Sequence, residues 1–169
     1  LLTSTERARD LRHPPVVLRG AGYLSGHRAG LEIGDFVGWK DFSNNFFHEL
    51  APRIYESAGL GPEDVDVVEL YDCFSSVVLD TLEAFGFCGR GEAGDFIRAG
   101  ETSRTGSRPT NTHGGLLSEG YLHGMNTLAE AVMQLQGRGG ARQVPDARIG
   151  LATSGANVDG AALILERDG

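Results

Sequence analysis

The 169-residue sequence is poor in cysteine, in positive charge and in long apolar runs, and each shortage argues against a class of function. Its two cysteines, Cys73 and Cys88, cannot build a disulfide framework and lack zinc-site spacing, so we expect no metal and a reducing, cytoplasmic setting. A formal charge of −8 argues against nucleic acid and anionic membranes as partners. No apolar run approaches the roughly 20 residues of a membrane helix, so no membrane insertion is expected. The first residues resemble neither a signal peptide nor a transit peptide.

Glycine is abundant, with 25 residues that cluster at the ends of the expected elements. That distribution is typical of tight turns and not of a flexible linker. The chain is long enough to bury a core, and its 40% hydrophobic content is ordinary for a globular protein. The length fits one domain, or one half of a two-part architecture.

Apolar residues alternate or run together where strands are expected. Val65–Leu70 begins with alternating residues and then becomes mainly apolar, which is typical of a short buried parallel strand. The apolar runs 149–152 and 161–165 flank a glycine-bearing turn and favour a hairpin of buried strands. A further strand is expected at Val16–Gly22. Tyr23–Asn45 has no clear period and is interpreted as a long loop, of the kind that usually covers a binding site.

Helical periodicity is strongest from Phe74 to Phe85, where apolar side chains recur every three or four residues before Gly86. Asp72 or Ser75 is expected to cap the start of this helix. Other helices are expected at Thr5–Leu11, from Pro52 (in the first turn) to Ala58, at 92–99 and at 121–136. The last of these has one apolar face, formed by Leu122, Met125, Leu128, Ala129, Val132 and Leu135. This order of elements predicts an α/β fold with a mixed β-sheet covered by helices.

Two junctions between a strand or turn and a helix carry titratable side chains. One is LYDCF at 70–74, and the other is GGLLSEGYLHGMN at 114–126. We expect these runs to face each other, with Tyr71 and Tyr121 as the reacting pair. Tyr71 is otherwise a buried core tyrosine, and Tyr121 a surface residue at a turn. His113 and His123 have structural alternatives too, and Cys73 is interpreted as a small buried residue, not a nucleophile.

Three collinear runs resemble the C-terminal half of thiolase-superfamily proteins, in the lipid-transfer-protein or sterol-carrier-protein-X branch. They are ELYDCFSSVVLDTLEAFGFCGRGEAGDFI, NTHGGLLSEGYLHGMNTLAEAVMQLQG and RQVPDARIGLATSGANVDGAALIL, and the similarity spans 52–165. The resemblance implies the C-terminal half of a thiolase fold. It divides the chain into 1–22, similar to the end of the N-terminal thiolase half, a loop region at 23–50, and a C-terminal thiolase-like domain at 51–169.

The sequence departs from that family where thiolases do their chemistry. Tyr71 stands where thiolases have an asparagine or histidine, and Tyr121 stands where they have the histidine of a GHP motif. The turn at 153–157 lacks their second cysteine, and the nucleophilic cysteine of their N-terminal half is not in this chain. The acid/base groups for Claisen chemistry are therefore missing from this half.

The combination of YDCF with GYLHGMN resembles the steroid side-chain aldolases of the same branch. The resemblance implies retro-aldol cleavage of a β-hydroxy acyl-CoA to propionyl-CoA and a ketone, with Tyr71 and Tyr121 as acid and base. A phenol has a pKa of about 10, so the base needs help from a neighbour such as His123 or a helix N-terminus. We favour Tyr121 as base, although the two roles stay open. His113, Gly114 and Gly115 are expected to contact the substrate, a coenzyme A thioester, and no cofactor is expected.

Two other functions stay open. One is an acetyl-CoA acyltransferase whose nucleophile lies in the other half, and the second is a non-catalytic protein that binds acyl-CoA or lipid. The family resemblance also implies a homodimer and a small partner protein with a zinc ribbon and an OB-fold. The loop Tyr23–Asn45 is a candidate cover for the substrate or for that partner. The identity of the acyl group does not follow from the sequence.

Overall fold

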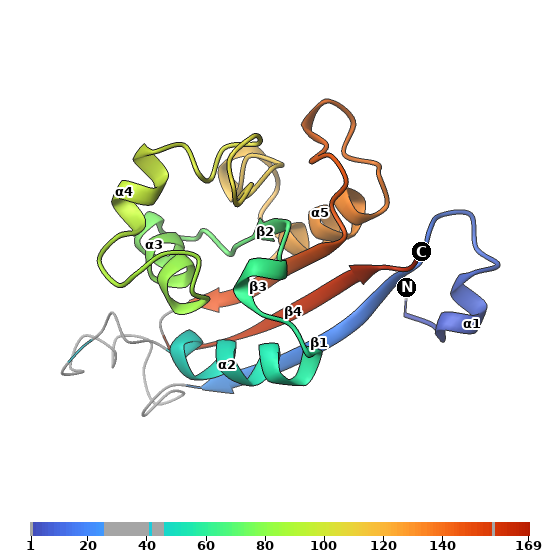
Figure 1. Ribbon diagram of the computed structural model, residues 1–169, viewed down its shortest axis with the longest axis horizontal. Coiled ribbons are helices and arrows are strands. Elements are labelled where there is room, and N and C mark those ends of the chain that lie inside the picture. Colours follow the sequence, from blue (N-terminus) through green and yellow to red (C-terminus); the bar gives the residue numbers. More distant parts are fainter. Residues whose placement is uncertain (1, 26–40, 42–45, 157) are drawn as a thin grey trace.

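The computed structural model describes residues 2–25, 41, 46–156 and 158–169, and its centre is a four-stranded sheet (Figure 1). The strand order is β1-β4-β3-β2. Strand β4 pairs antiparallel with β1 and with β3, whereas β2 pairs parallel with β3. The mixed sheet and the β3–β4 hairpin are therefore confirmed. The strand bounds are β1 Val16–Ser25, β2 Val67–Glu69, β3 Ile149–Ala156 and β4 Asp159–Arg167.

Helices cover both faces of this sheet (Figure 1). Alternate residues of a strand point to opposite faces. On β4, Ile164 packs with helix α2, while Leu165 packs in a second cluster with helix α5. The helix bounds are α1 Thr5–Ala8, α2 Phe47–Ala58, α3 Ser75–Ala84, α4 Ala93–Arg98 and α5 Met125–Leu135, with 3₁₀ turns η2 Pro62–Asp64, η3 Leu116–Ser118 and η4 Gly140–Arg142. No helix in the described ranges is long and apolar enough to cross a membrane.

Two predicted boundaries are wrong because tertiary packing extends the elements. Strand β1 pairs with β4 as far as Ser25, so the predicted loop does not begin at Tyr23. Helix α2 begins at Phe47, whose side chain is fully buried, and Pro52 therefore lies inside the helix and not in its first turn. The rest of the predicted loop lies outside the described residues, apart from Asp41. The division of the chain at 22 and 50 into parts of a thiolase architecture stays a prediction.

Helix α3 occupies the predicted place, but its start differs from the expectation. Phe74, predicted on the apolar face, has extended backbone angles and leaves the helical period, so its side chain is 63% exposed. No side chain caps the helix. The carboxylate of Asp72 instead accepts the backbone N–H of Leu116, from the run that follows the glycine pair. Asp72 therefore joins the two junctions and does not act as a cap.

Helix α5 corrects the prediction most strongly. It begins at Met125 and not at Tyr121. His123 and Gly124 have positive φ angles of 51° and 86°, and a right-handed helix cannot continue through such residues. The expected apolar face is right only in part. Leu128, Val132 and Leu135 pack in the second cluster, whereas Leu122 and Met125 are 61% and 58% exposed. The buried residues of α5 are Asn126, Thr127, Glu130, Ala131, Gln134 and Leu135. Buried polar groups require hydrogen-bond partners, and those of α5 have them.

Candidate active site

Strand β2 ends at Glu69, two residues before Tyr71, and two neighbouring segments fix this end. The backbone N–H of Leu70 donates to Oδ1 of Asn111 at 2.7 Å. The N–H of Tyr71 donates to Oγ1 of Thr153 on β3 at 3.0 Å. Backbone groups that would otherwise lack a partner beyond the strand are thus satisfied by side chains. Tyr71 is held in one orientation at the carboxyl end of the sheet.

The hydroxyl groups of Tyr71 and Tyr121 are in hydrogen-bond contact, and their ring centroids lie 6.1 Å apart. The prediction that the two junctions face each other is confirmed. Tyr71 is 7% exposed, whereas Tyr121 is 49% exposed. Burial, and next the hydrogen bond with Tyr121, raises the pKa of Tyr71 above its ordinary value, so this phenol stays protonated at neutral pH. Either hydroxyl can be the donor in the contact between the two tyrosines.

His123 packs edge-on against the ring of Tyr121, with the centroids 4.7 Å apart. Its backbone carbonyl accepts the hydroxyl of Ser154 at 3.2 Å. Contact with Tyr121 agrees with the prediction that His123 lies beside the reacting pair, whereas its catalytic role stays a prediction. Tyr121 itself lies in the segment before α5 and not on the first turn of the helix.

Asn126 holds the segment that carries Tyr121, and the sequence analysis did not single it out. Its Oδ1 accepts the N–H of Leu122 at 3.0 Å. Its Nδ2 donates to the carboxylate of Glu119 at 2.7 Å and to the carbonyl of Gly120 at 2.8 Å. An asparagine at the start of a helix after a glycine-rich run was the available signal. The side chain of Asn126 thus binds residues that precede it on both sides of Tyr121, and it holds the segment that carries Tyr121 in place.

His113 lies in the interior, with its side chain only 1% exposed. Its Nδ1 is 3.0 Å from Oε2 of Glu69, which is fully buried at the end of β2. Burial raises the pKa of Glu69, and hydrogen bonds from His113 and Thr112 offset this only in part. Burial opposes a charge on His113, yet the hydrogen bond and charge of Glu69 outweigh it and raise the pKa of His113. The pair as a unit therefore retains its proton as the pH rises.

Gly114 and Gly115 form the turn between His113 and η3. Both have positive φ angles, 96° and 74°, which favour glycine. A Cβ on Gly115 would collide with the carboxylate of Asp72. The close approach at Gly115 is thus to another part of the protein, and contact of His113, Gly114 and Gly115 with a substrate stays a prediction.

A buried polar network continues from Glu69 to the surface, and the sequence analysis missed it. Oγ1 of Thr112 lies 2.8 Å from Oε1 of Glu69 and 2.7 Å from Oε1 of Glu130. Gln134 donates to both Thr112 and Glu130 at 2.9 Å. The guanidinium of Arg142 donates to both oxygens of Glu130 at 2.8 and 2.9 Å. The buried polar residues Glu130 and Gln134 of α5 therefore belong to this network.

Comparison with known proteins assigns the chain to a family. The Thiolase C-terminal domain-like family matches residues 32–167, which is most of the sequence. This chain belongs to that family. The resemblance stated from its motifs is confirmed, and so is the α/β fold class.

Relatives of this thiolase-like domain include two bacterial enzymes. The chain is 40% identical to a steroid side-chain-cleaving aldolase of Thermomonospora curvata, over 99% of this chain and 42% of the relative. It is 38% identical to the 17-hydroxy-3-oxo-4-pregnene-20-carboxyl-CoA lyase of Mycobacterium tuberculosis, over 98% of this chain and 42% of the relative. A solved structure, the Ltp2-ChsH2(DUF35) aldolase, superposes with a TM-score of 0.90 at 41% identity over 97% of this chain and 42% of that one. The chain thus spans less than half the length of these relatives.

The cysteines of this thiolase-like domain do not have the properties of nucleophiles. Burial raises the pKa of Cys73 above its ordinary value, although this residue precedes α3. Burial, and next the charge of Glu83, raises the pKa of Cys88 to about 11. A nucleophilic cysteine needs a lowered pKa, so neither thiol is prepared for acyl transfer. The interpretation of Cys73 as a residue that is not a nucleophile is favoured, and the same holds for Cys88.

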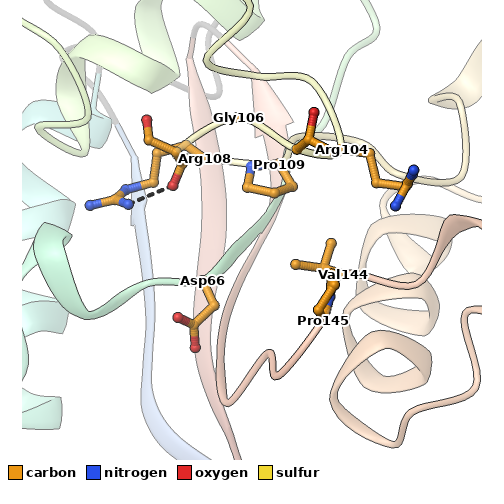
Figure 2. A pocket seen from close by; sticks show the side chains of 9 residues that line it. Asp66, Arg104, Gly106, Arg108, Pro109, Val144 and Pro145 are labelled. Atoms are coloured by element: carbon orange, nitrogen blue, oxygen red, sulfur yellow. Dashed lines mark hydrogen bonds between the residues drawn. The ribbon is translucent and has the colours of Figure 1, made fainter.

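A cavity of about 320 Å³ lies at the opposite end of β2, beside Asp66 and Val144 (Figure 2). Figure 2 shows the guanidinium groups of Arg104 and Arg108 pointing away from each other and from the cavity. The carboxylate of Asp66 is occupied by the backbone N–H groups of Arg148 and Ile149. Polar groups thus do not converge on this cavity, and the tyrosine pair is the better candidate active site.

Proposed function

We propose that this protein is part of a thiolase-superfamily lyase that cleaves a steroid-derived β-hydroxy acyl-CoA by a retro-aldol reaction. The observation that carries the proposal is the contact between the hydroxyls of Tyr71 and Tyr121. Tyr71 stands where thiolases have an asparagine or a histidine, and Tyr121 stands where they have the histidine of the GHP motif. The names of the two relatives, an aldolase and a carboxyl-CoA lyase, support the same reaction class.

The proposed reaction needs one base and one acid. The base removes the β-hydroxyl proton of the substrate, the oxygen electron pair forms the ketone, and the Cα–Cβ bond breaks. The bonding pair passes to Cα as a thioester enolate, which the acid protonates to give propionyl-CoA. Tyr71 suits the acid role because it is buried and its pKa is raised. Tyr121, which is half exposed and contacts His123, is assigned the role of base.

Tyr71→Phe and Tyr121→Phe test this proposal in the assembled enzyme. Each removes only a hydroxyl, and we expect each to lower turnover by about 10²- to 10⁴-fold, the usual contribution of acid–base catalysis. The measurement is propionyl-CoA release by mass spectrometry. Tyr55→Phe is the matched control, because the buried Tyr55 hydroxyl donates to the carbonyl of Phe85 and lies outside the site. It is expected to lower stability and leave turnover unchanged.

Unchanged turnover in both Tyr71→Phe and Tyr121→Phe would refute the proposal. The same enzyme is also incubated with acyl-CoA and its mass measured. An acyl group on a cysteine would show an acyltransferase instead, and tight binding without product in any assembly would show a non-catalytic protein.

We also propose that the protein works with a partner protein that carries a zinc ribbon and an OB-fold, and that it forms a homodimer. The printed name of the structural neighbour joins two components, Ltp2 and ChsH2(DUF35), which supports a two-protein assembly. Light scattering on the protein copurified from its native source is expected to give a mass above that of one chain. A fully active lone monomer would contradict this proposal.

A further inference from the structure

The hydroxyl of Thr112 has too few hydrogens for its neighbours. It carries one hydrogen. Oε1 of Glu69 and Oε1 of Glu130 lie 2.8 and 2.7 Å from Oγ1, both at hydrogen-bond distance. If both carboxylates were ionised, one of these contacts would join two oxygens with only lone pairs between them. One of the two carboxyl groups therefore carries the missing hydrogen.

Glu130 is not that group. Arg142 donates two hydrogen bonds to its two oxygens, and Gln134 donates a third. Burial opposes its charge, but these donors outweigh burial and lower the pKa of Glu130. Glu69 has no such cationic fork and is fully buried. An imidazolium at His113 would not supply the hydrogen either, because it faces the other oxygen, Oε2.

We propose that Glu69 is a neutral carboxylic acid whose hydrogen lies on Oε1 toward Thr112, and that it thereby fixes the tautomer of His113. Thr112 then donates its own hydrogen to Glu130, so both of its carboxyl contacts have one. Oε2 of Glu69 is left as a carbonyl acceptor for Nδ1–H of His113. Neutral His113 with a hydrogen on Nδ1 has a bare lone pair on Nε2.

The proposed protonation state of Glu69 determines whether Nε2 of His113 carries a hydrogen. It is buried and has no hydrogen-bond partner among the described residues. Two hydrogen bonds tie the segment that carries His113 to the residues on either side of Tyr71. Asn111 accepts the backbone N–H of Leu70, and Leu116 donates its backbone N–H to Asp72. Nε2 is thus a hydrogen-bond acceptor for a hydroxyl-bearing ligand and not a proton donor. Only this role of Nε2 rests on the proposed function, whereas the protonation state of Glu69 does not.

The charged groups around the pair favour a proton on it, and the contacts of Thr112 assign that proton to Glu69. Glu119 and Glu130 act on His113 from the loop before α5 and from α5, and both favour protons on the pair. Arg142, which faces the same network, is bound to Glu130. Glu69 and Glu130 would repel each other through Thr112 if both were ionised, and one proton removes that repulsion.

Glu69→Gln separates the neutral acid from a carboxylate. Glutamine has the shape of a protonated glutamate, so its NH₂ replaces the acid hydrogen toward Thr112 and its carbonyl accepts Nδ1–H of His113. We expect Glu69→Gln to keep the fold and the Nδ1–H tautomer at pH 7. The measurement is the pair of ¹⁵N shifts of His113 in labelled protein, with Nδ1 protonated and Nε2 bare in both proteins. Infrared difference spectra should show a protonated carboxyl band that Glu69→Gln removes.

Glu49→Gln is the matched control, because this exposed carboxylate pairs with Arg53 outside the network, so the same substitution there should leave the infrared band in place. An imidazolium with both nitrogens protonated in the wild type, whose pKa falls sharply in Glu69→Gln, would overturn the proposal. The absence of a protonated carboxyl band that depends on Glu69 would overturn it as well. Neither readout requires turnover, so failure here is distinct from failure of the proposed reaction.

Discussion

At the scale of single residues, the glycine pair shows how one backbone angle joins the two junctions. Gly115 has a φ of 74°, and a Cβ on it would collide with the Asp72 carboxylate. That carboxylate also accepts the N–H of Leu116. The missing side chain of Gly115 therefore allows Asp72 to tie the run before Tyr121 to the run that carries Tyr71.

Gly115→Ala is expected to lower the free energy of unfolding by about 3 kcal/mol, because it adds the collision to the strain of a positive φ. Chemical denaturation measures this loss. Gly59→Ala is the matched control, since Gly59 has a similar φ of 69° with open space around it. It should cost only about 1 kcal/mol. Equal losses in the two variants would show that contact with Asp72 is unimportant.

The tyrosine pair could be foreseen at this scale and the Glu69–His113 pair could not. Tyr71 and Tyr121 stand at positions where family motifs hold reactive groups, so their meeting followed from the resemblance. Glu69 lies within an apolar strand run, and nothing local shows that its carboxyl is fully buried against His113. A contact between residues that are far apart in sequence needs the tertiary fold.

At the scale of elements, the segment before α5 depends on one side chain. Asn126 holds Glu119, Gly120 and Leu122 together by three hydrogen bonds. Asn126→Ala removes the acceptor of the Leu122 amide, so the hydrogen-exchange rate of that amide is expected to rise. Turnover is expected to fall, because Tyr121 is no longer held in position. Stability should fall by about 1–3 kcal/mol for the unsatisfied groups.

Asn126→Asp provides the control for that variant. Its oxygen can still accept the N–H of Leu122, but it loses the donor bonds to Glu119 and Gly120. An intermediate exchange rate at Leu122 is expected. If Leu122 exchanges as slowly in Asn126→Ala as in the wild type, the holding role of Asn126 is wrong.

Helix α5 also marks where periodicity fails as a guide. The three-to-four-residue spacing of its apolar residues predicts an apolar buried face. The structure buries polar residues of this helix as well as apolar Leu135, because Glu130 and Gln134 are satisfied by Thr112 and Arg142. A hydrophobic pattern locates the helix correctly, yet it says nothing of partners that arrive from other elements. The strands were predicted better, because β2, β3 and β4 are apolar runs buried in one sheet.

At the scale of the whole molecule, charge makes stability depend on pH. Burial, and then repulsion by Glu83 and Asp41, raises the pKa of Asp80 to about 6, while Arg90 acts in the opposite direction. The folded protein therefore binds a proton here more tightly than the unfolded chain does. Stability contributed by this group is present at acid pH and is lost as the pH rises through about 6.

Asp80→Asn tests this dependence. The variant should be more stable than the wild type at pH 7 and similar to it near pH 4, with a modest difference because Asp80 is partly exposed. Thermal melts of both proteins between pH 4 and 7 measure the effect. A gap between the two proteins that does not change with pH would contradict the assignment.

Arg142 lies at the rim of the polar network, with 42% of its side chain exposed. An event at the surface, such as docking of an acidic molecule on that guanidinium, would weaken its hold on Glu130. The spare hydrogen would then be drawn across Thr112, away from Glu69, and the imidazole of His113 would face an anion in place of an acid. The buried pair of Glu69 and His113 is in that sense linked to the protein surface through the hydroxyl group of Thr112.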